Sequence, residues 1–122
     1  MTEKTKNIAL WVLTGLVAAL FLFSAFGKLA GGADSEKMAE GIGLTASSLK
    51  MIGIVELIAV ILFVIPRTGV LGTLLLAAYM GGAIATHVEH GQDIMAPCVI
   101  QAFVWIVAVL RFPELRQRLL GK

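Results

Sequence analysis

The chain has 122 residues, of which 58% are hydrophobic and 15% are charged. A soluble domain this small needs a larger share of polar residues to cover its surface, so the composition excludes an ordinary soluble fold and favours a membrane protein. The formal net charge of +2 is too small to indicate nucleic-acid binding, and the one cysteine, Cys98, excludes an internal disulfide and a CxxC redox pair.

The first predicted element is an apolar helix over residues 7–29, which follows Lys4 and Lys6 and is uncharged from residue 7 to residue 27. A cleaved secretory signal has an apolar region of about 7–15 residues, and this segment is longer. We therefore expect a retained membrane anchor. Cleavage between Ala30 and Ala33 is the alternative, because small residues gather there.

A longer polar connection follows this first helix. Its residues 34–40 favour a helix, while Met38, Ile42 and Leu44 give the segment an apolar side. This pattern predicts a short interfacial helix between the first and second membrane spans. The helix that comes next has its N-cap candidates at Thr45, Ser47 and Ser48.

Three more segments approach the length of about 20 apolar residues that a membrane helix requires, at residues 49–65, 68–86 and 94–110. Pro66 ends the second helix, and Pro97 falls in the first turn of the fourth, where its missing N–H is tolerated. Short loops make neighbouring helices antiparallel. The sequence therefore predicts one all-α domain over residues 1–122, a transmembrane antiparallel four-helix bundle.

Basic residues predict how the four spans are oriented. Three Lys residues lie on one side of the membrane, and seven Lys and Arg residues lie on the side of the two termini, namely Lys4, Lys6, Arg67, Arg111, Arg116, Arg118 and Lys122. The positive-inside rule then places both termini in the cytoplasm of a bacterial cell, with the protein in its cytoplasmic membrane. Residues 111–122 form a basic amphipathic cytoplasmic tail, which either lies on the anionic inner leaflet or is frayed and solvated.

Small and aromatic residues predict what the helix surfaces contact. Two rows of small residues run along the third span, Ala77, Gly81 and Ala85 in one and Ala78 and Gly82 in the other. Such rows let helices approach closely in lipid, so we expect this helix to be the most enclosed one or to pack on another subunit. Trp11 and Tyr79 are expected at the membrane interface or facing lipid.

Polar residues inside the spans are informative because each one costs free energy there. Glu56 lies in the second span, seven residues or about 10 Å below its predicted outer start. An ionised side chain at that depth costs at least ~2.5 kcal/mol. Lys28 is the expected ion-pair partner, and Ser24 shares its helix face at i, i+4. The alternatives are that Lys28 extends to the outer headgroups while Glu56 is protonated, or that the pair only fixes helix register.

Other polar side chains reach a similar depth from the outer side of the bundle. Thr86 and His87 end the third span, and Gln101 lies seven residues below the start of the fourth. If all of these groups face inward, they line one ligand-binding pocket that opens outward. Its predicted residues are Ser24, Lys28, Glu56, Thr86, His87 and Gln101.

The outer loop offers a second kind of site. His87 and His90 are spaced i, i+3 and, with Glu89, Asp93 or Glu56, could bind a divalent metal; a solvated acidic turn is the alternative. No nucleophile–base pair, phosphate loop or nucleotide fingerprint is visible. The sequence therefore assigns no catalytic residue, and no recognisable motif encodes a cofactor.

Three segments also carry a family resemblance. They read FLFSAFGKL at residues 21–29, GIVEL at residues 53–57 and MGGAIATH at residues 80–87. Their order and spacing resemble the DoxX-like family of small four-helix membrane proteins, over about residues 8–110. The resemblance implies the four-helix fold and marks Lys28, Glu56 and His87. Some relatives are associated with quinone-linked sulfur oxidation, others with oxidative-stress complexes and a distant animal branch with receptor assembly. With one cysteine, thiol-pair chemistry is not expected in this chain.

Three functional hypotheses follow. The first is a membrane protein that binds a small apolar molecule of the quinone or isoprenoid type in the outward-facing polar pocket. The second is a non-catalytic assembly or stability partner in a larger membrane complex, as a homo-oligomer or a subunit. The third is outward-facing handling of a divalent metal. Membrane lipids are expected partners in all three, and nucleic acid in none.

Overall fold

The computed structural model of the chain describes residues 2–30, 37, 40–41 and 43–121. These residues form helices joined by turns, and no strand occurs among them, so the prediction of an all-α chain is confirmed. The interfacial helix predicted at residues 34–40 lies mostly outside the described residues. In chain order the elements are α1 (Glu3–Ala30), α3 (Ala46–Val64), the 3-10 helix η1 (Pro66–Thr68), α4 (Gly69–Glu89), α5 (Met95–Arg111) and α6 (Pro113–Leu120).

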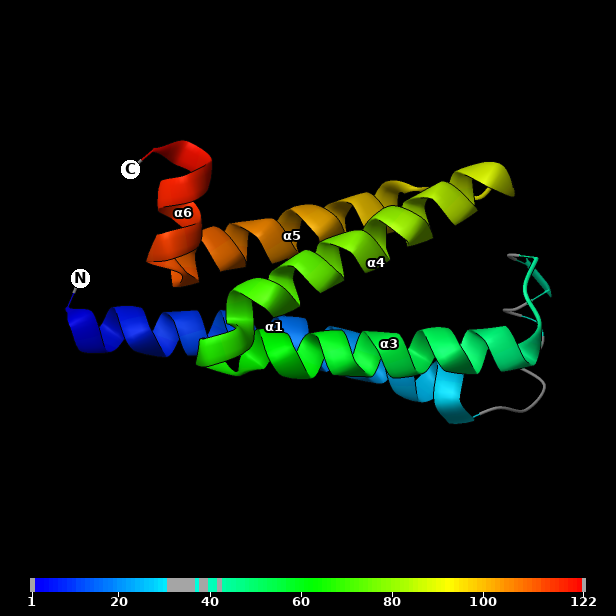
Figure 1. Cartoon of the computed structure of the whole chain (residues 1–122), viewed down its shortest axis with the longest axis horizontal. Coiled ribbons are helices and arrows are strands. Elements are labelled where there is room, and N and C mark those ends of the chain that lie inside the picture. Colours follow the sequence, from blue (N-terminus) through cyan, green and yellow to red (C-terminus); the bar gives the residue numbers. More distant parts are fainter. Residues whose placement is uncertain (1, 31–36, 38–39, 42, 122) are drawn as a thin grey trace.

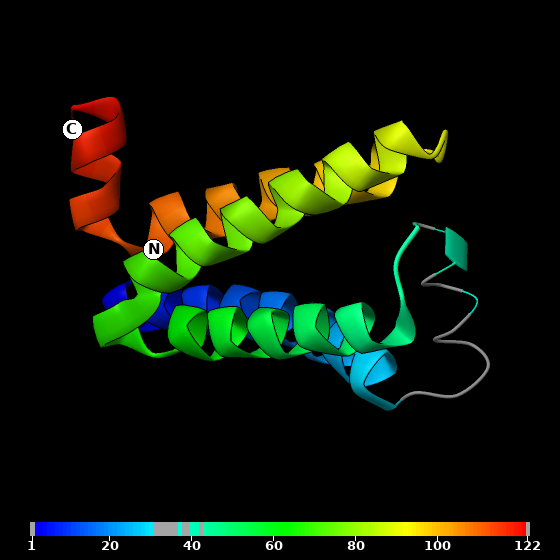
Figure 2. The ribbon, with the colours of Figure 1, turned by 45° about the vertical axis from the view of Figure 1, so that its right-hand side comes forward.

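The four long helices form two layers. Figures 1 and 2 show α1 beside α3 in one layer and α4 beside α5 in the other, with consecutive helices running in opposite directions. Both chain termini lie at the same end of the bundle, which we call the terminal end. The opposite end, which holds the loop between α4 and α5, is the loop end. The two layers diverge towards it.

Local chemistry explains where these helices begin and end. Thr45 is the N-cap of α3, and its hydroxyl oxygen accepts a hydrogen bond from the backbone N–H of Ser48 at 3.1 Å, as one of the predicted caps. Pro66 stands at the first position of η1, where a missing N–H is tolerated, and it ends α3 as predicted. The turn from α3 to α4 is therefore short, which brings these two helices together.

The lengths and surfaces of the helices identify a membrane protein. Three helical segments are long and apolar enough to cross a bilayer, and α5 with α6 makes a fourth if that pair, bent by 109°, is counted as one span. Large apolar side chains cover the outside of the bundle, among them Phe23 at 84% exposed. Such a surface is stable in hydrocarbon rather than in water. The described helices therefore form a helical membrane bundle.

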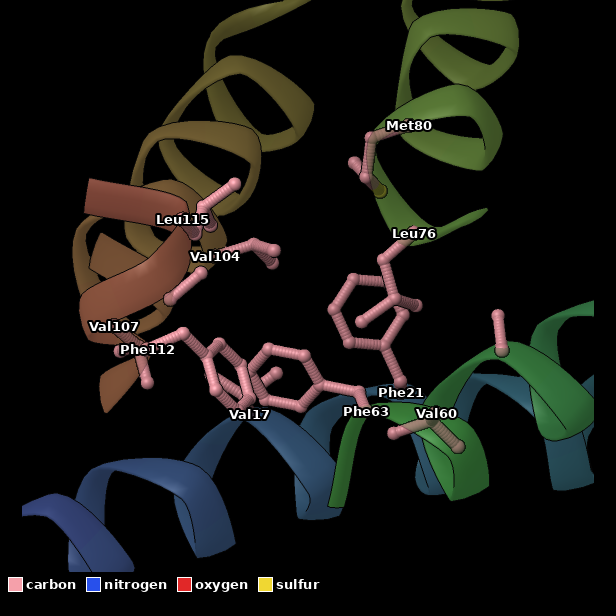
Figure 3. Packing of buried hydrophobic residues seen from close by; sticks show 12 residues of the cluster. Val17, Phe21, Val60, Phe63, Leu76, Met80, Val104, Val107, Phe112 and Leu115 are labelled. Carbon is pink, nitrogen blue, oxygen red and sulfur yellow. The ribbon is translucent and has the colours of Figure 1, made fainter. Parts of the chain in front are cut away.

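The apolar core lies in the terminal half of the bundle. Its largest buried side chains include Phe21 of α1, Phe63 of α3, Leu76 of α4 and Val104 of α5. Figure 3 shows these side chains meeting from all four long helices. The Phe63 and Phe112 rings pack edge to face, with centroids 6.4 Å apart. The polar side chains of the predicted pocket therefore lie in the middle of the bundle and towards the loop end.

Glycine allows the closest helix contact, between α3 and α4. A Cβ atom built on Gly72 would lie 2.1 Å from the backbone nitrogen of Phe63, so no larger residue fits there. By contrast, a Cβ built on Gly81 or Gly82 meets no atom within 4 Å. Ala78 and Ala85 of the two small-residue rows are exposed as well, and Ala77 is half-buried. Within this chain, the close approach therefore occurs at Gly72. Packing by the rows stays a prediction for another subunit.

Arg111 joins three helices at the terminal end. Its guanidinium donates hydrogen bonds to the carbonyl oxygens of Phe63 and Val64, which end α3 and have no partner within that helix. The guanidinium carbon lies 5.0 Å from the ring centroid of Trp11 and 4.7 Å from that of Phe112. A residue expected only to orient the protein in the membrane thus also caps a helix.

Candidate functional site

Glu56 lies in the middle of α3. The helix begins at Ala46, three residues before the predicted start, so Glu56 is ten residues or about 15 Å along it. The side chain is buried, with the residue 1% exposed. Glu56 is therefore further from the start of its helix than its sequence position predicted.

Two residues of α1 contact this acid. The Lys28 ammonium lies 3.0 Å from Oε1 of Glu56 and donates to the Ser24 hydroxyl at 2.5 Å. The Ser24 hydroxyl in turn donates to the same carboxylate oxygen at 3.2 Å. Because Ser24 and Lys28 are one helical turn apart, they face the same neighbour. The ion pair expected between Lys28 and Glu56 is present, and we call Ser24, Lys28, Glu56 and the nearby Tyr79 the polar network.

Tyr79 of α4 brings a third helix into the network. Its ring centroid lies 5.6 Å from the Lys28 ammonium, and the tyrosine interacts electrostatically with both Lys28 and Glu56. The ring also packs edge to face on Phe21, with centroids 6.3 Å apart. Tyr79 is half-buried with its ring against α1, so it does not simply face outward as the sequence suggested. A tyrosine near the middle of a span, too deep for the headgroup layer, was the available indication of a polar partner.

Gly53 makes room for the lysine stem. A Cβ atom built on Gly53 would lie 3.0 Å from Cβ of Lys28 and 3.4 Å from the carbonyl oxygen of Ala25. This glycine therefore holds α3 against α1 at the point where the Lys28 side chain turns into the bundle. Gly53 begins the GIVEL segment, and its position in the sequence does not reveal this contact.

The other predicted pocket residues do not join the polar network through any contact among the described residues. Gln101 donates from Nε2 to the carbonyl oxygen of Ala77 at 3.1 Å, which links α5 to α4. Its Oε1 atom is buried and has no hydrogen-bond partner among the described residues. The Thr86 hydroxyl donates to the carbonyl of Gly82, and Nδ1 of His87 lies 2.6 Å from that of Ala83. Thr86 and His87 thus bond to their own helix.

The predicted metal ligands are likewise bonded to their own helix or exposed. Nδ1 of His90 lies 3.0 Å from the carbonyl oxygen of Thr86, and Glu89 is exposed. Within the part of the chain that the structure describes, no group of three His, Cys, Asp or Glu side chains is arranged to hold a metal ion. His87, Glu89 and His90 therefore gain no support as a metal site.

A family model matches most of the chain. The model of the DoxX-like family covers residues 12–109, a range that includes the residues of the polar network and most of each long helix. The chain belongs to the DoxX-like family. No curated protein and no solved structure gives a significant match. The family and the apolar helices together make this DoxX-like protein an integral membrane protein.

The electrostatics of this DoxX-like protein are concentrated in the polar network. Among the described residues, Lys28 and Glu56 form the only ion pair within 4.0 Å. The network combines an ammonium, a carboxylate, a hydroxyl and a phenol within one small region of the bundle. Because the surroundings are apolar, its hydrogen bonds are stronger than they would be in water. Such a set of groups can donate to a carbonyl or accept from a hydroxyl of a bound molecule.

Proposed function

We propose that this DoxX-like protein binds a small apolar molecule with a polar head, of the quinone or isoprenoid class, at the polar network. The carrying observation is the buried Lys28–Glu56 pair near the middle of a membrane bundle. Ionisable groups at that depth are expensive, so their presence favours a functional site over a purely structural one. We also propose a bacterial cytoplasmic membrane location with both termini in the cytoplasm, because most basic residues lie at the terminal end.

We infer that such a molecule approaches from the side of α4. Beyond Met80, no described side chain of α4 is buried, so the loop-end half of this helix is not enclosed by the chain. An apolar molecule in the outer leaflet can therefore approach this half of the bundle from the lipid. It would pass the apolar side chains of this half before it meets the polar network, as ligands do in other sites for apolar molecules.

Gln101 offers a further contact on the same side. Its Oε1 is a buried acceptor without a donor, which is costly in an apolar environment. The hydroxyl of a reduced quinone or of an isoprenoid alcohol would supply that donor. The polar network and Gln101 come from helices α1, α3, α4 and α5, so a ligand head between them would touch the whole bundle.

The direct test measures binding of a benzoquinone with a short alkyl tail to the full-length protein in detergent micelles. Glu56→Gln should weaken binding about tenfold or more, because the head loses a charged partner. Glu89→Gln is the matched control, an exposed acid at the loop end, and should leave the affinity unchanged. Gln101→Leu, which alters no charge, should also weaken binding while circular dichroism shows an unchanged helix content. Equal affinities for the parent protein and Glu56→Gln would overturn the proposal.

A specific observation favours an assembly role as the second candidate function. The faces of Gly81 and Gly82 are open within this chain, and rows of small residues pack helices in lipid. In that case the bundle stabilises a larger membrane complex or a homo-oligomer. Gly81→Leu should then disrupt complexes isolated by size-exclusion chromatography, whereas the double variant Lys28→Met with Glu56→Gln, which leaves no buried charge, should leave them intact. The reverse result would favour ligand binding.

A further inference from the structure

Two adjoining cavities lie at the terminal end, far from the polar network. One of about 330 Å³ is lined by Asn7, Trp11, Pro66, Arg111, Pro113 and Glu114, together with two apolar residues. The other is an open, shallow hollow on one face of α1, lined by Lys4, Asn7, Ile8, Trp11 and Val12. Asn7 and Trp11 line both, so the two hollows adjoin, and together we call them the terminal groove.

The bend between α5 and α6 shapes this groove. The two helices meet at 109°, so α6 turns away from the bundle axis and brings Pro113 and Glu114 opposite the first turns of α1. Phe112 at the bend is buried, with its ring against Gly69 and Phe63. The wall of the groove is therefore fixed by core packing rather than by an exposed tail.

Arg111 places an unpaired positive charge in the groove. Two of its five N–H groups are used by the carbonyl oxygens that end α3, and no acidic side chain among the described residues lies within ion-pair distance. Three aromatic rings surround its guanidinium, the Phe63 centroid at 5.4 Å being the farthest. The remaining N–H groups form a planar donor set of the kind that binds phosphate oxygens.

The rest of the groove matches the other parts of a phospholipid. The Lys4 ammonium and the Asn7 amide lie at the water side, and Lys4 is seven residues or about 10 Å along α1 from Trp11. Deeper in the membrane, Ile8, Val12 and Leu16 are exposed on one stripe of α1 and would contact acyl chains. Glu114 is the opposing charge, because its carboxylate would repel a phosphate placed against Arg111.

We propose that the terminal groove binds one phospholipid of the adjacent leaflet, with the lipid phosphate held by Arg111 and Asn7 and with Lys4 adding a second positive charge further along α1. Trp11 lies at the level of the upper acyl chains, where an indole ring is favoured in membranes. This site is separate from the polar network, so it neither requires nor excludes a ligand there. A free phosphate shares the headgroup chemistry but not the apolar stripe, and the test separates the two.

Trp11 provides the measurement because it lines the groove. In a Trp105→Phe background, Trp11 is the one tryptophan left in the chain. The full-length protein is placed in phosphatidylcholine vesicles that contain phosphatidylglycerol with brominated acyl chains, which quench a neighbouring indole. The parent protein should bind phosphatidylglycerol in preference to phosphatidylcholine. Inorganic phosphate added to the solution should not reduce the quenching.

Two variants decide the result without disturbing the core. Lys4→Ala should lower the preference for phosphatidylglycerol about fivefold, whereas Lys6→Ala, its matched control outside the groove, should not change it. Glu114→Gln should raise the preference, because a like charge is removed. Equal quenching by both lipids, equal losses in Lys4→Ala and Lys6→Ala, or displacement by inorganic phosphate would each overturn the proposal.

Discussion

Lys28 and Glu56 are paired through one oxygen atom of the carboxylate, in an apolar part of the bundle. One carboxylate oxygen of Glu56 receives the ammonium at 3.0 Å and the Ser24 hydroxyl at 3.2 Å. Burying two charges is expensive, and their mutual attraction offsets that cost only when the hydrogen bonds are complete. Removing one partner alone therefore leaves a charge with no compensation inside the bundle.

A double-mutant cycle on Lys28 and Glu56 tests whether their pairing stabilises the protein. Lys28→Met should destabilise the protein by about 3–5 kcal/mol, because Glu56 keeps its burial and loses its partner. Adding Glu56→Gln should recover most of this loss, because no buried charge remains. The measurement is unfolding by sodium dodecyl sulfate in mixed micelles, followed by circular dichroism. If Lys28→Met is as stable as the parent protein, the pair contributes nothing and the cycle contradicts our interpretation.

Helical periodicity explains why part of the network was predictable. Ser24 and Lys28 share a face at i, i+4, and an acid inside an apolar span demands a partner, so the sequence indicated their meeting with Glu56. Tyr79 was not identified, since an aromatic residue in a span is equally compatible with lipid. Thr86 and His87 bond to their own helix backbone, a local solution that residue spacing does not reveal.

At the scale of elements, the contact between α3 and α4 depends on one glycine. Pro66 makes the connection short, and Gly72 then allows the backbone of α4 to touch that of α3 at Phe63. The sequence placed the ends of these helices within a few residues, because caps and prolines act locally. The sequence does not distinguish Gly72 from Gly81 and Gly82, because a row of small residues does not reveal which helix it contacts.

Substitutions at two glycines of α4 test this helix contact. Gly72→Ala should destabilise the protein by about 1–3 kcal/mol or more, since the new Cβ would overlap the backbone of Phe63, which cannot move freely. Gly81→Ala is the matched control and should be neutral or slightly stabilising, because open space surrounds it and alanine favours a helix. The same unfolding measurement applies. Equal effects of the two substitutions would contradict the close contact assigned to Gly72.

At the scale of the whole molecule, the number of membrane crossings depends on α5. Its 17 residues span about 25 Å, slightly less than the roughly 30 Å of a hydrocarbon core. The helix nevertheless lies along α4, and both chain termini lie at the terminal end. A bundle with this arrangement places its termini on one side of the membrane only if α5 crosses, with α6 leaving the bundle at the 109° bend.

Labelling of single cysteines tests this topology. In a Cys98→Ser background, Thr2→Cys, Glu89→Cys and Gln117→Cys place thiols at exposed positions near the N-terminus, at the loop end and on α6. A membrane-impermeant maleimide added to intact spheroplasts should label Glu89→Cys alone, and the other two should react after the membrane is permeabilised. Labelling of Gln117→Cys together with Glu89→Cys would mean that α5 does not cross. Labelling of Thr2→Cys and Gln117→Cys alone would keep four crossings and reverse the orientation. Because Lys28 is paired inside the bundle, fewer basic residues face water at the loop end than the three counted from the sequence. The excess of basic residues at the terminal end is therefore larger, which strengthens the orientation that the labelling tests.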